Sequence, residues 1–196
     1  PRTNKRTDKW GGTPENRRRF AREVVKAVRD AVGENFIIVF RLSMIDLVPE
    51  GQTPEEILAL AGEVQDAGAT IINTGIGWHE ARVPTIVTSV PRAAFAEFTA
   101  EVRKSVNIPV VASNRINDPQ TGEDLIANDK ADLISMARPF LADPDFVTKA
   151  AEGRADAINT CIACNQACLD HTFENKRASC LVNPRACHER SLVLLP

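Results

Sequence analysis

The sequence predicts an α/β fold built on a parallel sheet. Segments whose apolar residues recur at helical spacing alternate with short apolar runs over residues 1–155. Such alternation is typical of parallel strands joined by right-handed helical crossovers. All five cysteines lie after residue 160, so a cysteine-free body precedes a cysteine-rich segment. Hydrophobic residues make up 43% of the 196 residues, which is enough for a globular protein with a buried core.

The helices are indicated by their first residues. Thr13 followed by Pro14 begins a helix that Gly33 ends. Residues 53–56, Thr-Pro-Glu-Glu, have the form of a capping box and begin a second helix. Further helices are expected over 91–106, from Asp118-Pro119 onward, and from residue 143 to about residue 153.

Four apolar runs, at 36–40, 70–73, 109–112 and 133–135, predict strands. The first run, Phe-Ile-Ile-Val-Phe, is continuous, as expected of a strand buried on both faces. The polar side chains that come at the ends of the runs are Arg41, Asn73 with His79 beyond it, Asn114-Arg115 and Arg138.

These arginines distinguish between an open doubly wound sheet and a (β/α)8 barrel. The carboxyl ends of all barrel strands surround one site, whereas an open sheet brings together only the residues at its switch point. Three arginines at one mouth would bind an anion, above all a phosphate. Because four strands cannot close a barrel, we expect residues 1–155 to be the C-terminal half of a TIM (β/α)8 barrel from a longer protein.

Residues 156–196 are expected to bind an iron–sulfur cluster. The spacing Cys161-x2-Cys164-x3-Cys168-x11-Cys180 places three thiols within eight residues and a fourth on a later loop, which suits a [4Fe–4S] cluster. Zinc, disulfides and free thiols are the alternatives, although structural zinc more often uses two separated C-x2-C pairs. Cys187 is left over and is interpreted as a buried or incidental thiol. A free-standing electron carrier or a zinc-binding interaction module would also fit this segment.

Composition excludes several classes of function. The net charge of −2 argues against nucleic acid as the main partner. No apolar run reaches the roughly 18 to 20 residues that a membrane span needs, and the first residues do not have the form of a signal peptide. Unbridged cysteines suit a reducing compartment, so we expect a cytoplasmic location. Gly75-Ile76-Gly77 begins like a dinucleotide-binding loop, but Glu80 stands at the third glycine position, and close approach of a flat ligand is the better interpretation.

Three stretches and the four spaced cysteines carry a resemblance to a known family. Residues 73–82 (NTGIGWHEAR), 113–118 (SNRIND) and 135–140 (SMARPF) resemble bacterial NADPH-dependent 2,4-dienoyl-CoA reductases. These enzymes belong to the old yellow enzyme class and carry an added iron–sulfur cluster. The likeness runs over essentially the whole chain. The arginines and cysteines are shared with a wider group that includes trimethylamine dehydrogenase and 2-enoate reductases, whereas residues 77–82 are more specific.

The resemblance implies a three-part enzyme with an FMN barrel, a [4Fe–4S] cluster and an FAD/NADPH domain. Electrons would pass from NADPH through FAD, the cluster and FMN to a carbon–carbon double bond of 2,4-dienoyl-CoA, a step in the β-oxidation of unsaturated fatty acids. Arg41 would lie against the N1/C2-carbonyl side of the flavin and stabilise its anionic reduced form. Arg115 and Arg138, beside the Ala137 backbone, would hold the FMN phosphate.

The same resemblance implies a substrate site and a ligand set. His79 would be the catalytic residue, donating a hydrogen bond to the thioester carbonyl. Glu80, Ala81 and Arg82 would line the substrate, and Arg2 would meet its CoA end. The cluster ligands would be Cys161, Cys164, Cys168 and Cys180.

Two departures from the family follow from the residues present. The proton-donating tyrosine of the family lies in a barrel segment that would precede Pro1, and this chain has no tyrosine. The glycine-rich FAD and NADPH motifs would follow Pro196. We therefore expect the chain alone to be inactive. Reduction of an enoate or oxidation of an N-methyl amine on the same architecture, and a non-enzymatic iron–sulfur carrier, are the alternative functions.

Overall fold

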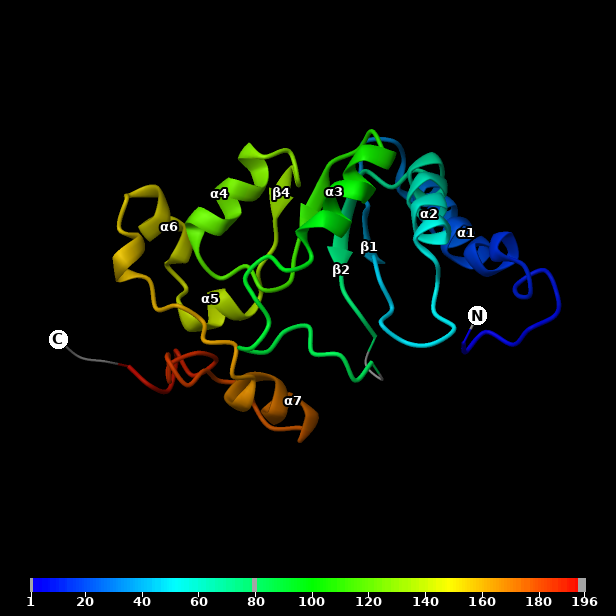
Figure 1. Ribbon diagram of the computed structural model, residues 1–196. Coiled ribbons are helices and arrows are strands. Elements are labelled where there is room, and N and C mark those ends of the chain that lie inside the picture. The colour runs from blue at the N-terminus through cyan, green and yellow to red at the C-terminus, as the bar shows by residue number, and fades with distance from the viewer. Residues whose placement is uncertain (1, 79–80, 194–196) are drawn as a thin grey trace.

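The computed structural model describes residues 2–78 and 81–193 and contains a four-stranded parallel sheet. The strands are β1 (Val39–Ser43), β2 (Ile71–Gly75), β3 (Val110–Ala112) and β4 (Leu133–Ile134), and they lie in the order β1-β2-β3-β4. Figure 1 shows β1 and β2 pointing toward the side of the molecule where the C-terminal segment lies. The carboxyl ends of the strands and the cysteine-rich segment therefore face each other.

The first strand differs from its prediction. It begins at Val39 rather than residue 36, and Phe36 and Ile37 are exposed. Arg41 is consequently a residue within the strand, opposite Asn73 of β2, and does not follow the strand. The expectation of burial on both faces is wrong, because Val39 is 53% exposed on the sheet face that the helices leave open. Burial alternates along the strand, as it does when only one face packs against helices.

Three helices begin where the sequence predicts. α1 (Pro14–Val32) is capped by Thr13, α2 (Pro54–Asp66) by Thr53 and α4 (Pro119–Ala127) by Asp118, each side chain accepting a backbone N–H bond. The side-chain oxygen of Thr53 lies 3.3 Å from the N–H nitrogen of Glu56. The reciprocal half of this capping box is absent, since the Glu56 carboxylate pairs with Arg17 of α1 instead.

The remaining helices are shorter than predicted or were missed. α3 covers Ala96–Ser105 rather than 91–106, because Ala93 adopts a left-handed φ of 51° that a helix cannot include. α6 covers only Phe146–Ala151, after Asp143 turns its carboxylate inward. Four short helical segments of the described chain have no counterpart in the prediction: α5 (Arg138–Ala142), η1 (Ala155–Ala157), the π-helical η2 (Gln166–Asp170) and α7 (His171–Phe173).

The core lies between one face of the sheet and the helices that cover it. Leu42 and Ile72 of the sheet pack against Leu60 and Val64 of α2 and Val102 of α3. A second cluster joins Ala112 and Ile134 to Leu125 of α4. The opposite face stays open, and Leu133 is 46% exposed there. This layering, with helices outside and an open inner face, is that of part of a β/α barrel.

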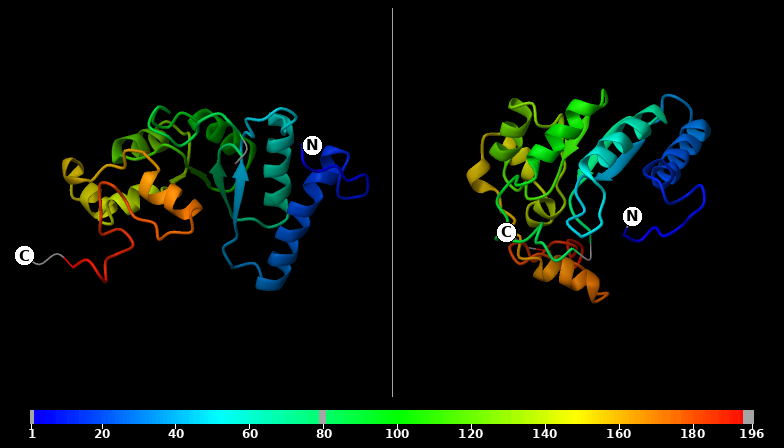
Figure 2. Two further views of the ribbon diagram at one scale, coloured as in Figure 1. Left: turned by 90° about the horizontal axis from the view of Figure 1, so that it is seen from below. Right: turned by 45° about the vertical axis from the view of Figure 1, so that its right-hand side comes forward.

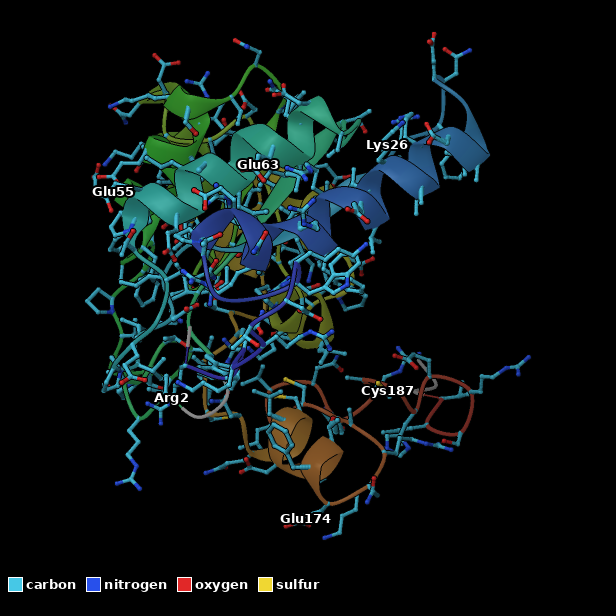
Figure 3. All side chains as sticks on the ribbon, turned by 90° about the vertical axis from the view of Figure 1, so that its right-hand side faces the viewer. Arg2, Lys26, Glu55, Glu63, Glu174 and Cys187 are labelled. Carbon is cyan, nitrogen blue, oxygen red and sulfur yellow. The ribbon has the colours of Figure 1, made fainter. Side chains whose placement is uncertain are left out.

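α1 packs along α2, as both views of Figure 2 show, and its buried Val25 belongs to the same core cluster. The side chain of Glu63 projects from α2 toward α1 (Figure 3), where it pairs with Arg18 at 2.9 Å. Within the described residues, no helix has both the length and the hydropathy needed to cross a membrane.

Candidate functional site

A cleft of about 1160 Å³, measured out to its open mouth, lies at the carboxyl ends of the strands. The sheet side of this strand-end cleft is lined by Arg41 of β1, residues 76–78 after β2 and Asn114 after β3. Its other side is lined by the C-terminal segment, through Asn165, Leu169 and Asp170. The cysteine-rich segment therefore forms one wall of a site whose other wall is the sheet.

Arg41 presents a guanidinium in this cleft that has no hydrogen-bond or ion-pair partner among the described residues. A Cβ atom added at Gly75 would lie 3.2 Å from Nη2 of Arg41, so a larger residue here would require the guanidinium to shift by a few tenths of an ångström. In-register pairing puts Arg41 and Asn73 on the same sheet face. The Oδ1 atom of Asn73 is buried and has no partner in the described part of the chain. Within the described part of the chain, a cation and an acceptor that both lack a partner fit a ligand that carries both acceptors and donors.

Arg115 and Arg138 form a second cationic site. Asn114 and Arg115 both adopt left-handed backbone conformations, with φ of 70° and 57°. Each such residue costs about 1–2 kcal/mol, a strain that persists only where the surroundings demand it. The Nε atom of Arg115 donates to the carbonyl of Val90 at 2.8 Å, which fixes the side chain.

The positive charges around Arg115 favour the binding of an anion. Burial lowers the pKa of Arg115, and the positive charges of Arg138 and Arg92 act in the same direction, whereas Cys161 opposes them. Neither Arg115 nor Arg138 has a carboxylate partner among the described residues. Ala137 immediately precedes Arg138 at the start of α5. Two guanidiniums without carboxylate partners suit a phosphate, because their remaining N–H groups can donate charge-assisted hydrogen bonds to it.

The four spaced cysteines line one cavity of about 310 Å³. Cys161, Cys164, Cys168 and Cys180 all border it, together with Arg138 and apolar side chains. We call it the four-cysteine cavity. Cys187 is exposed and does not border it, so the expectation of a buried thiol is wrong and the interpretation as an incidental thiol is left. The sequence spacing thus identified a set of thiols that the fold brings together.

The thiols are close enough to influence one another. Burial raises the pKa of Cys168, and Cys164 and Cys161 also raise it, while the backbone N–H of Leu169 and the charge of Arg138 lower it. All five cysteines are free thiols. In the described chain, no group of three or more His, Cys, Asp or Glu side chains is arranged to hold one metal ion.

Side-chain hydrogen bonds that the sequence analysis missed fasten the cysteine-rich segment to the barrel. Asn117 donates from Nδ2 to the carbonyl of Cys161 at 2.7 Å, and Thr88 donates to the carbonyl of Ile162 at 2.6 Å. Asn183 donates to the carbonyl of Leu141 at 2.9 Å. Only Asn117 had a signal in the sequence, since it lies in the 113–118 stretch that carries the family resemblance.

The predicted substrate residues are placed in part. The guanidinium of Arg2 lies over the ring of Trp78, 5.9 Å from its centroid, and donates to the carbonyl of Pro49 at 3.3 Å. Figure 3 shows Arg2 far from Lys26, on the side of the molecule where the C-terminal segment lies. Ala81 lines the strand-end cleft, whereas Arg82 is exposed and is not part of its lining. The predicted residues His79 and Glu80 lie outside the described residues.

Comparison with known proteins gives relatives that are much longer than this chain. A family model described as "NADH:flavin oxidoreductase / NADH oxidase family" matches residues 1–157. A metal reductase from Desulforamulus reducens is 44% identical over 196 residues, covering 100% of this chain and 29% of the relative. An NADH oxidase from Thermoanaerobacter brockii is 38% identical over 191 residues, covering 96% of this chain and 29% of the relative. The chain thus spans less than a third of the length of these proteins.

The solved structures that match are also longer than this chain. A 2-naphthoyl-CoA reductase in complex with 2-naphthoyl-CoA superposes with a TM-score of 0.93 at 36% identity, covering 95% of this chain and 29% of that one. An old yellow enzyme homologue from Zymomonas mobilis has a TM-score of 0.59 at 24% identity, covering 77% of this chain and 41% of that one. At that identity the second match shows the fold alone. Together with the parallel sheet, these matches confirm the prediction of an α/β chain that forms part of a barrel.

Proposed function

The chain belongs to the NADH:flavin oxidoreductase / NADH oxidase family of old yellow enzyme-like proteins, and we propose that it forms the flavin- and cluster-binding part of an enzyme that reduces a carbon–carbon double bond of an acyl-CoA thioester. The narrower form of this proposal is that the enzyme reduces 2,4-dienoyl-CoA with electrons from NADPH. The observation that carries the proposal is the strand-end cleft, where Arg41 of the sheet faces the segment that bears the four cysteines.

The residues present fit FMN. Arg41 and the unsatisfied Oδ1 of Asn73 offer a cation and an acceptor to a planar ring system, and Gly75 leaves space beside them. Arg115 and Arg138 would bind the phosphate, with the backbone of Ala137 beside them. When bound, FMN supplies hydride transfer and the cluster supplies one-electron transfer. The fixed charge of Arg41 would stabilise negative charge that develops on a ligand in the cleft.

The four-cysteine cavity fits a [4Fe–4S] cluster. Its four thiols come from one short stretch and one later loop, and apolar side chains such as Leu141, Ile162 and Val182 also line it. Asn117 and Thr88 hold the carbonyls of Cys161 and Ile162, so the ligand loop is positioned by the barrel. These contacts support cluster binding close to the flavin cleft.

A CoA thioester suits the opposite rim of the site. Arg2 lies on Trp78, and together they offer a cation and an aromatic face to a nucleotide with phosphate groups. His79 and Glu80 directly follow Trp78 in the chain, and Ala81 lines the cleft. We assign His79 the role of hydrogen-bonding the thioester carbonyl, which makes the conjugated double bond more electrophilic and assists protonation.

Oxidation of an amine is the second candidate. Asp170 lines the strand-end cleft, and its carboxylate has no ion-pair partner among the described residues. A carboxylate in the cleft would attract a cationic amine and would repel an anionic acid.

Turnover assays of the protein encoded by the complete reading frame separate these functions. Anaerobically purified protein should contain FMN and four iron atoms, and it should reduce a 2,4-dienoyl-CoA with NADPH. Turnover of 2-naphthoyl-CoA in place of the dienoyl thioester would keep the thioester reductase and reject the narrower substrate. Turnover of dimethylamine alone would establish the second candidate. Iron without flavin would reject both and favour an electron carrier.

A further inference from the structure

Asn165 borders two cavities at once. It lines the four-cysteine cavity, one residue after Cys164, and it also lines the strand-end cleft opposite Arg41. It is the one described residue that these two linings share. Any ligand in the cleft and any group held by the thiols would therefore have Asn165 between them.

The backbone of Asn165 is held in a conformation that few residues adopt readily. Its φ of 65° and ψ of −8° are left-handed, which asparagine tolerates better than other residues with a side chain. Its carbonyl accepts the N–H of Asp170 at 3.0 Å and so begins the π-helical turn that carries Cys168. This conformation aims the amide side chain toward the barrel.

The side chain meets the phosphate-site arginine. The Oδ1 atom of Asn165 accepts a hydrogen bond from Nη1 of Arg138. Arg138 borders the four-cysteine cavity, and its charge also acts on Arg115 and on Cys168. One guanidinium thus faces the proposed phosphate site and the proposed cluster, and Asn165 is the residue that fixes it.

We infer that Asn165 is a positioning residue that couples flavin binding to the cluster through Arg138. The inference rests on the proposed function. A neutral amide orients the guanidinium and leaves its full charge available to the phosphate and to the thiolate-bound group. A carboxylate at this position would neutralise Arg138 and add negative charge beside the cluster.

Two variants of the full-length holoprotein test this role. Asn165→Gly keeps the left-handed backbone and removes the acceptor, and we expect the dissociation constant of FMN to rise about tenfold, the effect of one lost charge-assisted bond. Asn165→Asp keeps the shape of the side chain. We expect it to weaken FMN binding further and to lower the midpoint potential of the cluster, because added negative charge disfavours reduction.

Asn175→Gly is the matched control, since Asn175 is also left-handed, with φ of 57°, but is exposed and lines neither cavity. FMN binding is measured by fluorescence titration, and the potential by redox titration monitored by electron paramagnetic resonance. Both quantities should stay at the wild-type value in the control. Unchanged values in both Asn165 variants would overturn the inference. Wild-type protein without iron or flavin would instead overturn the proposed function.

Discussion

The carboxylate of Asp143 accepts a hydrogen bond from the backbone N–H of Asn159 at 2.8 Å, although only 1% of Asp143 is exposed. Lys149 donates to the same carboxylate at 2.6 Å, and the N–H of Asp145 donates at 3.0 Å. This buried carboxylate ties the chain just before Cys161 to the end of the barrel. The position of the four-cysteine cavity therefore depends on a residue outside it.

Asp143→Asn should destabilise the protein by about 2–3 kcal/mol, because it removes one partner of a buried ion pair and leaves the Lys149 ammonium without a counter-charge. Urea unfolding followed by circular dichroism measures the free energy of unfolding. Glu152→Gln is the control, since Glu152 pairs with Arg154 in an exposed position. An Asp143 variant as stable as the control would contradict a structural role for this carboxylate.

The stability of the protein should depend on pH through the same carboxylate, Asp143. Burial by itself would raise the pKa of Asp143, but the bonds from Lys149, Asn159 and Asp145 outweigh it and lower the pKa below its ordinary value. Asp143 therefore stabilises the fold fully above its unfolded pKa of about 3.9, and this contribution is lost as the pH falls through the lower folded pKa. The difference in free energy of unfolding between wild type and Asp143→Asn should be large at pH 7 and should shrink below about pH 4. A difference that is constant with pH would assign the effect to packing.

Arg138→Ala should release the flavin from the full-length protein. We expect the dissociation constant of FMN to rise at least a hundredfold, because a bidentate, charge-assisted phosphate contact is lost. Flavin fluorescence after gel filtration measures retention. Arg154→Ala, which removes an exposed guanidinium elsewhere, should retain FMN. Tight retention in the Arg138 variant would count against the phosphate assignment.

Gly75→Ala tests the placement of Arg41. The added methyl group would lie 3.2 Å from Nη2 of Arg41 and should shift the guanidinium by a few tenths of an ångström, so we expect FMN affinity to fall by about two- to threefold. Gly62→Ala on α2 is the matched control, since a Cβ atom there meets nothing within 4 Å and should stabilise the helix slightly. FMN affinity equal in the two variants would show that Arg41 does not contact the flavin.

His79→Ala should lower the kcat of the full-length enzyme by roughly 10- to 1000-fold while FMN stays bound, as expected for loss of an acid or electrophilic partner. Steady-state assays with the thioester substrate and a flavin absorbance spectrum measure the two quantities. The spectrum controls for loss of cofactor. An unchanged kcat would remove His79 from the mechanism.

Local signals predicted the parts of the fold that depend on neighbours in the chain. Thr13, Thr53 and Asp118 cap helices where their sequence context indicates. The strand predicted from the apolar run at 36–40 was placed wrongly, because composition alone does not tell which residues pair across a sheet. In the structure, register with β2 puts Arg41 inside the strand.

The functional site, like the fold, could be predicted from the sequence only where it depends on local patterns. The cysteine spacing is a local pattern, and it identified thiols that share a cavity. Asn165 and Asp143 act through partners far along the chain, 27 residues away at Arg138 and 16 residues away at Asn159. Such contacts arise from tertiary packing, and no spacing rule reveals them. The left-handed backbone at Arg115 also needed the structure, since arginine is not typical of that conformation.

The open face and the two outer strands of the sheet have a practical consequence. β1 and β4 each have one neighbour in the sheet, and Val39 and Leu133 expose apolar surface beside those unsatisfied backbone edges. Strand borders of this kind recruit other polypeptides by backbone pairing and promote precipitation. Preparations of the polypeptide on its own should be kept dilute and cold, and its colloidal behaviour should be monitored by light scattering before any binding data are interpreted.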